Sequence, residues 1–231
     1  MKECPKLSGT IGIIVAIEKE KQAFLEKFGE PDIIYDDAPG YEVCTWLDKG
    51  HCRIYLLLSG YGEIAATAAT QYLIDEYRVD CIINYGAVGG LCEDYSVQKV
   101  GFIKKIVHYG FDLSVGEYPV GRYPNQESLF ISPREEALSQ ESLGDLLEFT
   151  CASADKFVGP GEPKRRLRKE FWADICEMEA AGIVITCNRN HIPCSFIKAV
   201  SDGVNEGGEA FEQNVTSAAK ACVEVIARYI L

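Results

Sequence analysis

Several features that would mark a specialised class of protein are missing from the 231 residues of this chain. No apolar run is long enough to cross a bilayer, and the N-terminal residues lack the basic and apolar regions of a signal peptide. The ten cysteines are scattered without a C-x-x-C pair, and the three histidines lie far apart. Neither a disulfide framework nor a metal site is therefore expected. We expect a protein without metal or other cofactor, working in a reducing cytoplasm.

Positive charge is also scarce. The chain has 23 lysines and arginines against 35 acids, which gives a formal net charge of −12. Such a charge argues against nucleic-acid and membrane partners and leaves a small uncharged ligand open. A short basic cluster, "KRRLRK" at 164–169, is interpreted as a solvated helix face.

Apolar strand-like runs and helix-like segments alternate along the chain. The alternation predicts one α/β domain over residues 1–231, a three-layer αβα fold with a mixed, largely parallel central sheet. Strands are expected at 11–17, 79–86, 148–155 and 194–200, one or two more within 99–110, and two more within 41–60. Helices are expected at 18–29, 63–78, 177–191 and 211–231. The longest irregular segment, 116–133, is expected to be a flexible or partner-contacting loop.

Four short segments combine acids or glycines with the end of an apolar run. They are the acids Glu18 and Glu20 after the first strand, "NYGAVGG" at 84–90, "EMEAAGI" at 177–183, and Ser201-Asp202. Each has an ordinary explanation, as an acidic first turn of a helix, a glycine turn or a cap. The carboxyl edge of an α/β sheet is, however, where binding and catalytic sites form. We interpret 84–90 as a glycine-rich turn and 177–183 as the start of a helix.

Taken together, these segments resemble the nucleoside phosphorylase and nucleosidase superfamily, with 5′-methylthioadenosine/S-adenosylhomocysteine nucleosidases as the closest pattern. The resemblance covers nearly the whole chain and rests on "IGIIVAIEKE", "SGYGEIAATAAT", "VDCIINYGAVGG", "SADKF", "EMEAAGI" and "AVSD". It implies a nucleoside phosphorylase-like fold and hydrolysis of the N-glycosidic bond of adenine nucleosides, in methionine salvage. It also implies a homodimer in which a partner residue closes each pocket.

The resemblance further implies a catalytic pair, Glu20 and Asp202. Asp202 would protonate or hydrogen-bond N7 of adenine, because a purine anion is a poor leaving group. Its pKa should then be raised by burial and by neighbouring acids. Glu20 would activate the water that attacks the anomeric carbon from the opposite side of the ribose.

The implied substrate contacts involve both the base and the sugar. Phe157 would stack on the base, Glu179 would accept hydrogen bonds from the sugar hydroxyls beside Met178, and Phe211 would lie near the 5′ substituent. The full set of implied binding residues is Phe157, Met178, Glu179, Ala87, Gly89, Ser201 and Phe211.

Two residues depart from the family pattern near the position of the attacking water. Ala87 stands where the family commonly has serine, and Lys198 stands where it has arginine. Lysine keeps the charge but loses the planar fork of the guanidinium. The loop after Asp112 also matches poorly, which leaves the 5′ group of the substrate open.

Two alternatives remain at the level of sequence. A purine nucleoside phosphorylase shares "EMEAAGI", but it needs cationic and hydroxyl groups around phosphate, where this chain has the carboxylate of Glu20. A nucleoside-binding protein with weak turnover would suit Ala87 and Lys198. The presence of Glu20, Glu179 and Asp202 argues against that second alternative, because a pure binder has little use for an intact acid/base set.

Overall fold

The computed structural model describes residues 7–38, 40–138, 143–144 and 146–231. These residues form a nine-stranded mixed sheet in the order β2-β3-β4-β1-β5-β8-β7-β6-β9. The strands are β1 (Gly9–Val15), β2 (Ile33–Ala38), β3 (Tyr41–Lys49), β4 (Cys52–Leu58), β5 (Cys81–Gly90), β6 (Val100–His108), β7 (Leu147–Ser153), β8 (Ile175–Glu177) and β9 (Cys194–Asp202). The helices are α1 (Glu18–Phe28), α2 (Glu63–Tyr77), the 3-10 turn η1 (Ser114–Gly116), α4 (Glu162–Phe171), α5 (Ala180–Asn190) and α6 (Gly208–Ile230).

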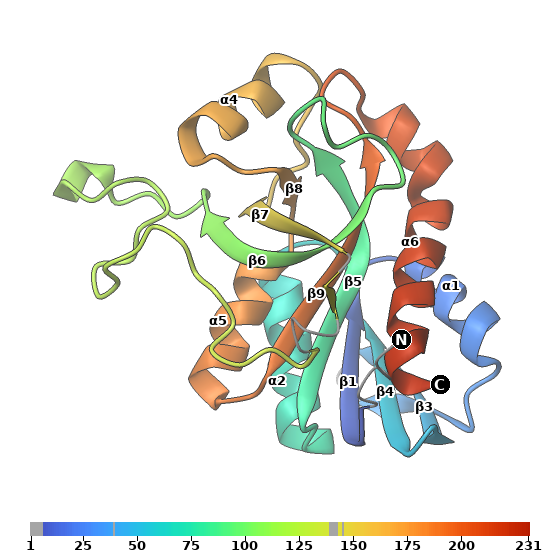
Figure 1. Ribbon diagram of the computed structural model, residues 1–231. Helices are drawn as coiled ribbons and strands as arrows, with labels where there is room; N and C mark the ends of the chain where they lie inside the picture. The colour runs from blue at the N-terminus through green and yellow to red at the C-terminus, as the bar shows by residue number, and fades with distance from the viewer. Residues whose placement is uncertain (1–6, 39, 139–142, 145) are drawn as a thin grey trace.

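Helices cover both faces of the sheet, which gives the three-layer αβα arrangement expected from the sequence. Helices α1 and α6 pack on one face, and α2 and α5 pack on the other (Figure 1). The central strands β4, β1, β5 and β9 run parallel. Because such strands are buried on both sides, their sequences are continuous apolar runs rather than alternating ones.

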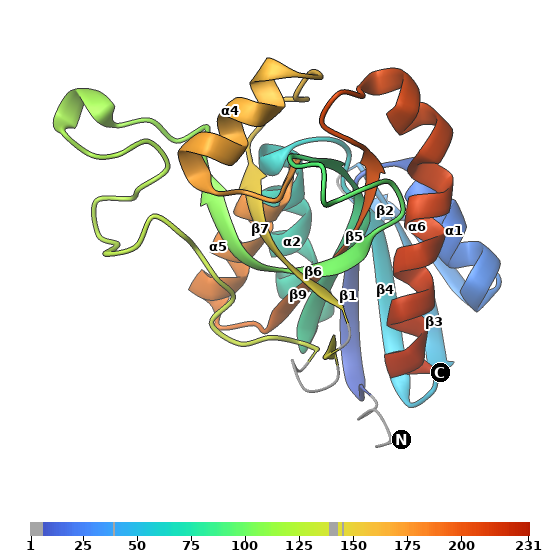
Figure 2. The ribbon, with the colours of Figure 1, turned by 45° about the horizontal axis from the view of Figure 1, so that its top comes forward.

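The second half of the sheet closes on itself. Strand β5 pairs with both β8 and β9, and β6 pairs with both β7 and β9, so β5-β8-β7-β6-β9 form a ring (Figures 1 and 2). Helix α4 lies over this half, and its buried Leu167 and Phe171 pack with Val107, Ala152 and Cys176 of the ring. The ring leaves β5 shared between the open sheet and the closed part.

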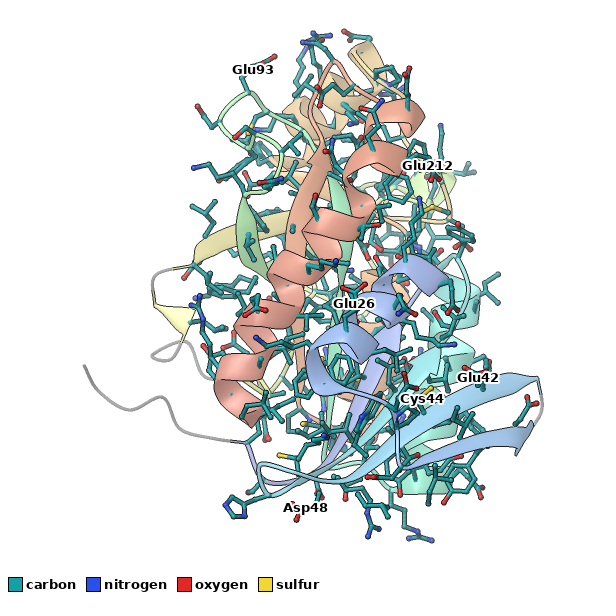
Figure 3. All side chains as sticks on the ribbon, turned by 90° about the vertical axis from the view of Figure 1, so that its right-hand side faces the viewer. Glu26, Glu42, Cys44, Asp48, Glu93 and Glu212 are labelled. Atoms are coloured by element: carbon teal, nitrogen blue, oxygen red, sulfur yellow. The ribbon has the colours of Figure 1, made fainter. Side chains whose placement is uncertain are left out.

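Surface ion pairs join the two helices on one face. Lys220 of α6 lies 2.7 Å from Glu26 of α1, and Lys27 lies 2.8 Å from Glu224. Figure 3 looks onto this face, where Glu26 is labelled on α1 beside α6. Exposed pairs contribute at most about 1 kcal/mol each, so the apolar core between the helices and the sheet is the main contact.

Two expectations about local structure are wrong. The segment 84–90 is not a turn, because β5 continues to Gly90 and pairs with β9 along its length. The glycine at 86 instead lets the Glu20 carboxyl approach the strand backbone, because a Cβ at Gly86 would lie 2.2 Å from Glu20 Oε1. The segment 177–183 does not start as a helix either, because Glu177 ends β8 and α5 begins at Ala180.

Part of the described chain after β6, within residues 109–138, projects from the body of the molecule (Figures 1 and 2). Residues 117–138 contain turns and an isolated bridge between Ile106 and Ile131, but no helix or strand. The irregular segment expected at 116–133 is thus present and somewhat longer. None of the helices in the described ranges is long and apolar enough to cross a membrane.

Candidate active site

A pocket opens where the carboxyl ends of β1, β5, β8 and β9 meet. It encloses about 610 Å³ of empty space, part of it open to solvent. Its walls include eight of the nine residues expected from the sequence: Glu20, Ala87, Gly89, Phe157, Met178, Glu179, Asp202 and Phe211. Ser201 lies behind the wall, fully buried, with its Oγ 2.7 Å from Asp202 Oδ1.

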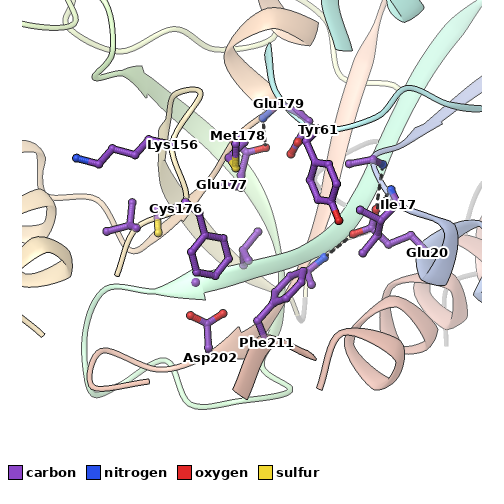
Figure 4. Close-up of a pocket in the computed structure, with 16 residues that line it drawn as sticks. Ile17, Glu20, Tyr61, Lys156, Cys176, Glu177, Met178, Glu179, Asp202 and Phe211 are labelled. Atoms are coloured by element: carbon purple, nitrogen blue, oxygen red, sulfur yellow. Dashed lines mark hydrogen bonds between the residues drawn. The ribbon is translucent and has the colours of Figure 1, made fainter. Parts of the chain in front are cut away.

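Glu20 is held on one side of the pocket by backbone N–H groups. It lies in the first turn of α1 and is 4% exposed. Oε2 accepts hydrogen bonds from the N–H groups of Ala16 (3.0 Å) and Ile17 (3.4 Å), and Oε1 accepts one from Ala87 (3.0 Å; Figure 4). Burial raises the pKa of Glu20, although the Lys198 charge and these three donors oppose the shift. The result is a fixed carboxyl with an increased affinity for a proton.

A cluster of buried charges adjoins Glu20. Lys198 Nζ lies 3.5 Å from Glu177 Oε2, and the same oxygen accepts the N–H groups of Glu179 (3.0 Å) and Ala180 (2.9 Å) at the start of α5. Burial would lower the pKa of Lys198, but the carboxyls of Glu177, Glu179 and Glu20 together raise it. Lys198 therefore supplies a positive charge at the position where the family pattern has arginine. Three carboxyl groups share this charge.

Glu179 forms part of the wall between these groups and the open pocket. Its Oε1 accepts the N–H of Gly62 at 2.9 Å, and burial together with the nearby Glu177 raises its pKa to about 8. Around neutral pH the carboxyl therefore binds a proton readily. Glu179 can both donate and accept hydrogen bonds toward a ligand hydroxyl.

Asp202 ends β9 on another side of the pocket and is 2% exposed. Its Oδ2 lies 2.5 Å from the ammonium group of Lys164, which is itself 0% exposed. The expectation of neighbouring acids at Asp202 is wrong for its ion-pair partner, which is a cation. Figure 4 shows Asp202 and Glu20 on different sides of the cavity.

Lys164 also corrects the interpretation of the basic cluster. Arg165, Arg166 and Lys169 are exposed as expected, but Lys164 points into the protein. A signal was present in the sequence, because Lys164, Leu167 and Phe171 are spaced to lie on one face of a helix. A lysine within an apolar stripe predicts a buried partner for its charge.

Aromatic side chains stand at the open part of the pocket. Phe157, 50% exposed, and Phe211 make an edge-to-face contact with ring centroids 5.7 Å apart. Tyr61, 67% exposed, also lines the cavity. Sequence reasoning left Tyr61 out, together with Glu177, Lys156 and Cys176 of the lining; Glu177 stood within the "EMEAAGI" motif already singled out.

A sheet that brings separated acids, a glycine-rich strand and aromatic side chains to one pocket is an arrangement typical of α/β proteins that bind small ligands. The chain belongs to the phosphorylase superfamily, whose family model matches residues 10–231.

Individual relatives narrow the comparison within that superfamily. The chain is 30% identical over 219 residues to a 5′-methylthioadenosine/S-adenosylhomocysteine nucleosidase of Tolumonas auensis, covering 91% of this chain and 94% of the relative. It is also 30% identical over 203 residues to an aminodeoxyfutalosine nucleosidase of Helicobacter pylori, covering 85% and 86%. A solved 5′-methylthioadenosine/S-adenosylhomocysteine nucleosidase of Helicobacter pylori superposes with a TM-score of 0.86 at 26% identity, over 94% and 96% of the two chains.

Proposed function

We propose that this protein is a nucleosidase that hydrolyses the N-glycosidic bond of adenine nucleosides, such as 5′-methylthioadenosine and S-adenosylhomocysteine. The products are adenine and the thioribose sugar. The observation that carries the proposal is the placement of two buried carboxyl groups, Glu20 and Asp202, on different sides of one pocket. The 5′-methylthioadenosine/S-adenosylhomocysteine nucleosidase among its relatives supports the choice of substrate, and the aminodeoxyfutalosine nucleosidase supports the nucleosidase class.

The two acids divide the reaction between leaving group and nucleophile. Asp202 delivers a proton to N7 of the purine as the glycosidic bond breaks, so the base departs neutral. Glu20 takes a proton from a water that attacks the oxocarbenium-like anomeric carbon. Its increased proton affinity suits a general base. Glu179 binds the ribose hydroxyls, with Met178 against the sugar.

The remaining contacts orient the nucleoside. Phe157 stacks on the adenine ring, where an aromatic face adds stabilisation to apolar burial. Phe211 lies toward the 5′ substituent, and Gly89 leaves room for the substrate beside β5. Ala87 contributes its backbone N–H to Glu20, which does not depend on the missing serine hydroxyl. Ser201 steadies Asp202 from behind.

Hydrolysis is favoured over phosphorolysis by the charges near Glu20. A phosphate dianion needs free donors and cations. Here the Ala87 N–H is bonded to Glu20, and Lys198 is shared among Glu20, Glu177 and Glu179. A carboxylate at this place repels phosphate. The alternative of a binding protein with weak turnover, which Ala87 and Lys198 would suit, is disfavoured because both expected reactive acids line the pocket.

We further propose that the protein is a cytoplasmic homodimer. The nine cysteines within the described residues carry free thiols, as suits a reducing compartment. The family resemblance implies that a second copy completes the 5′ side of the pocket, and the projecting segment 117–138 provides surface for such a contact. Light scattering should give twice the 25.5 kDa chain mass. A monomer with full activity at low protein concentration would contradict the dimer.

The function is tested with a panel of nucleosides. Purified protein receives 5′-methylthioadenosine, S-adenosylhomocysteine, aminodeoxyfutalosine, adenosine and inosine, each with and without phosphate, and free base and sugar products are measured. We expect adenine and a free sugar from the first two, at a rate independent of phosphate. Turnover that requires phosphate and yields sugar-1-phosphate would overturn the hydrolase. The order of rates within the panel identifies the 5′ substituent and hence any place in methionine salvage.

A further inference from the structure

Lys164 is a fully buried cation whose hydrogen bonds all lead to the end of β9 and the loop after it. Its Nζ lies 2.5 Å from Asp202 Oδ2, 2.7 Å from the carbonyl oxygen of Gly203 and 3.1 Å from that of Glu206. The carbonyl oxygen of Asp202 is 3.3 Å away. An ammonium group has three hydrogens to donate, so these acceptors fully engage it. Burying such a charge is costly unless it is paired and hydrogen-bonded, as it is here.

The contact belongs to a wider connection between α4 and the loop 203–207. Gly161, which precedes α4, donates its N–H to the carbonyl oxygen of Val204 at 2.7 Å. Arg165, which directly follows Lys164 in α4, donates a hydrogen bond to Asn205 Oδ1 at 2.5 Å. The Arg165 side chain is exposed and does not line the pocket. Lys164 and Arg165 therefore join the same two segments, and only Lys164 is bonded to Asp202.

Few polar or charged side chains of the described residues lie near the Asp202 carboxyl. Ser201 meets Oδ1 from the same strand, and Lys164 meets Oδ2 from α4. Cys176 of β8 lies beside the pair, and burial raises the pKa of its thiol to about 12, so the thiol is neutral. The Glu206 carboxylate accepts the Gly203 N–H at 2.8 Å. Lys164 is thus the cation available to compensate a negative charge on Asp202 among the described residues near it.

We propose that Lys164 is the positioning residue of the general acid: it fixes the Asp202 carboxyl toward the purine and stabilises the carboxylate that remains after proton transfer. This inference rests on the proposed function. In the step concerned, the O–H bond of Asp202 breaks and an N–H bond forms at N7. The electron pair of the glycosidic bond passes to the base, the water oxygen bonds to the anomeric carbon, and Glu20 takes the water proton. Lys164 keeps its own protons throughout.

The test compares Lys164→Gln with Arg165→Gln, which make the same change at neighbouring positions. Each variant is assayed with 5′-methylthioadenosine and with 4-nitrophenyl 5-methylthioriboside, whose leaving group departs without a proton. We expect Lys164→Gln to lower kcat on the nucleoside by about a hundredfold, within the range of general acid catalysis. KM and the rate on the nitrophenyl riboside should change by less than about threefold. Arg165→Gln should match the wild type on both substrates.

A double-mutant cycle separates action through Asp202 from general structural damage. If Lys164 acts through the carboxyl, Lys164→Gln should cause no further loss in an Asp202→Asn background. Equal losses on both substrates, additive losses in the cycle, or a wild-type rate in Lys164→Gln would each overturn the proposal. If Lys164→Gln does not fold, Lys164→Arg replaces it in the same assays, because the bulkier guanidinium keeps the charge but displaces the carboxyl. A wild-type protein that releases no adenine refutes the proposed function instead, whatever the variants do.

Discussion

The two acids of the pocket are equally buried but differently held. Glu20 is fixed by three backbone N–H groups, which carry partial charges, whereas Asp202 is fixed by a hydroxyl and a full ammonium charge. In the proposed hydrolysis Glu20 gains a proton and becomes neutral, a form that burial favours. In the same proposal Asp202 loses a proton and becomes an anion, for which Lys164 supplies the counter-charge. For Glu20, burial favours the neutral state while its N–H donors and Lys198 favour the ionised one; for Asp202, the Lys164 charge favours the anion.

The largest effect is expected from removing either acid, and it tests whether the two sides differ in role. Asp202→Asn and Glu20→Gln should each lower kcat on 5′-methylthioadenosine by about a hundred- to ten-thousand-fold. On the nitrophenyl riboside, Asp202→Asn should recover much of its rate while Glu20→Gln stays slow, because the water still needs a base. Circular dichroism serves as the folding control. If Asp202→Asn turns over the nucleoside at the wild-type rate, Asp202 is not the general acid and has only a structural role.

A smaller effect is expected at Glu179, which has a raised pKa like Glu20 but contacts a single backbone N–H. Its folded pKa of about 8 exceeds the ordinary value of 4.5, so between these values the folded state binds the extra proton. The free energy of unfolding should therefore fall as pH rises from about 4.5 to 8, by at most about 1.4 kcal/mol per pH unit for this group. Urea unfolding should show a flatter pH dependence in Glu179→Gln, and an unchanged slope would contradict the shift.

The smallest effect is expected from Ala87→Ser, which adds a hydroxyl beside Glu20 and keeps the backbone N–H. A neutral hydrogen bond contributes about 0.5–1.5 kcal/mol, so kcat should change by no more than about tenfold. Steady-state assays with 5′-methylthioadenosine measure it. A much larger gain would mean that the backbone donors alone do not orient Glu20 or its water.

Much of this architecture could be predicted from the sequence, since the apolar runs and helical spacing are strong local signals. The strand 81–90 was recognised only to Gly86, because its glycines are typical of a turn and their purpose, the approach of Glu20, is a long-range contact. The edge strand β2 (Ile33–Ala38) was missed because "IIYDDA" is half polar. The partner of Asp202 could not be predicted because their contact is also long-range: Lys164 lies 38 residues away in the sequence.

The pairing of β5 with β9 has a consequence for how the site can change. Glu20 is bonded to Ala87 of β5, while Asp202 is paired in register with Gly89, two residues further along the same strand. A strand advances about 6.6 Å over two residues, so the backbone of β5 sets the spacing between the two acids. Three other residues of the pocket, Tyr61, Phe157 and Phe211, lie outside β5 and β9, on connections and at the start of a helix. Mutations at these three residues can thus change which ligand groups the pocket accepts, while the spacing of the two acids stays the same.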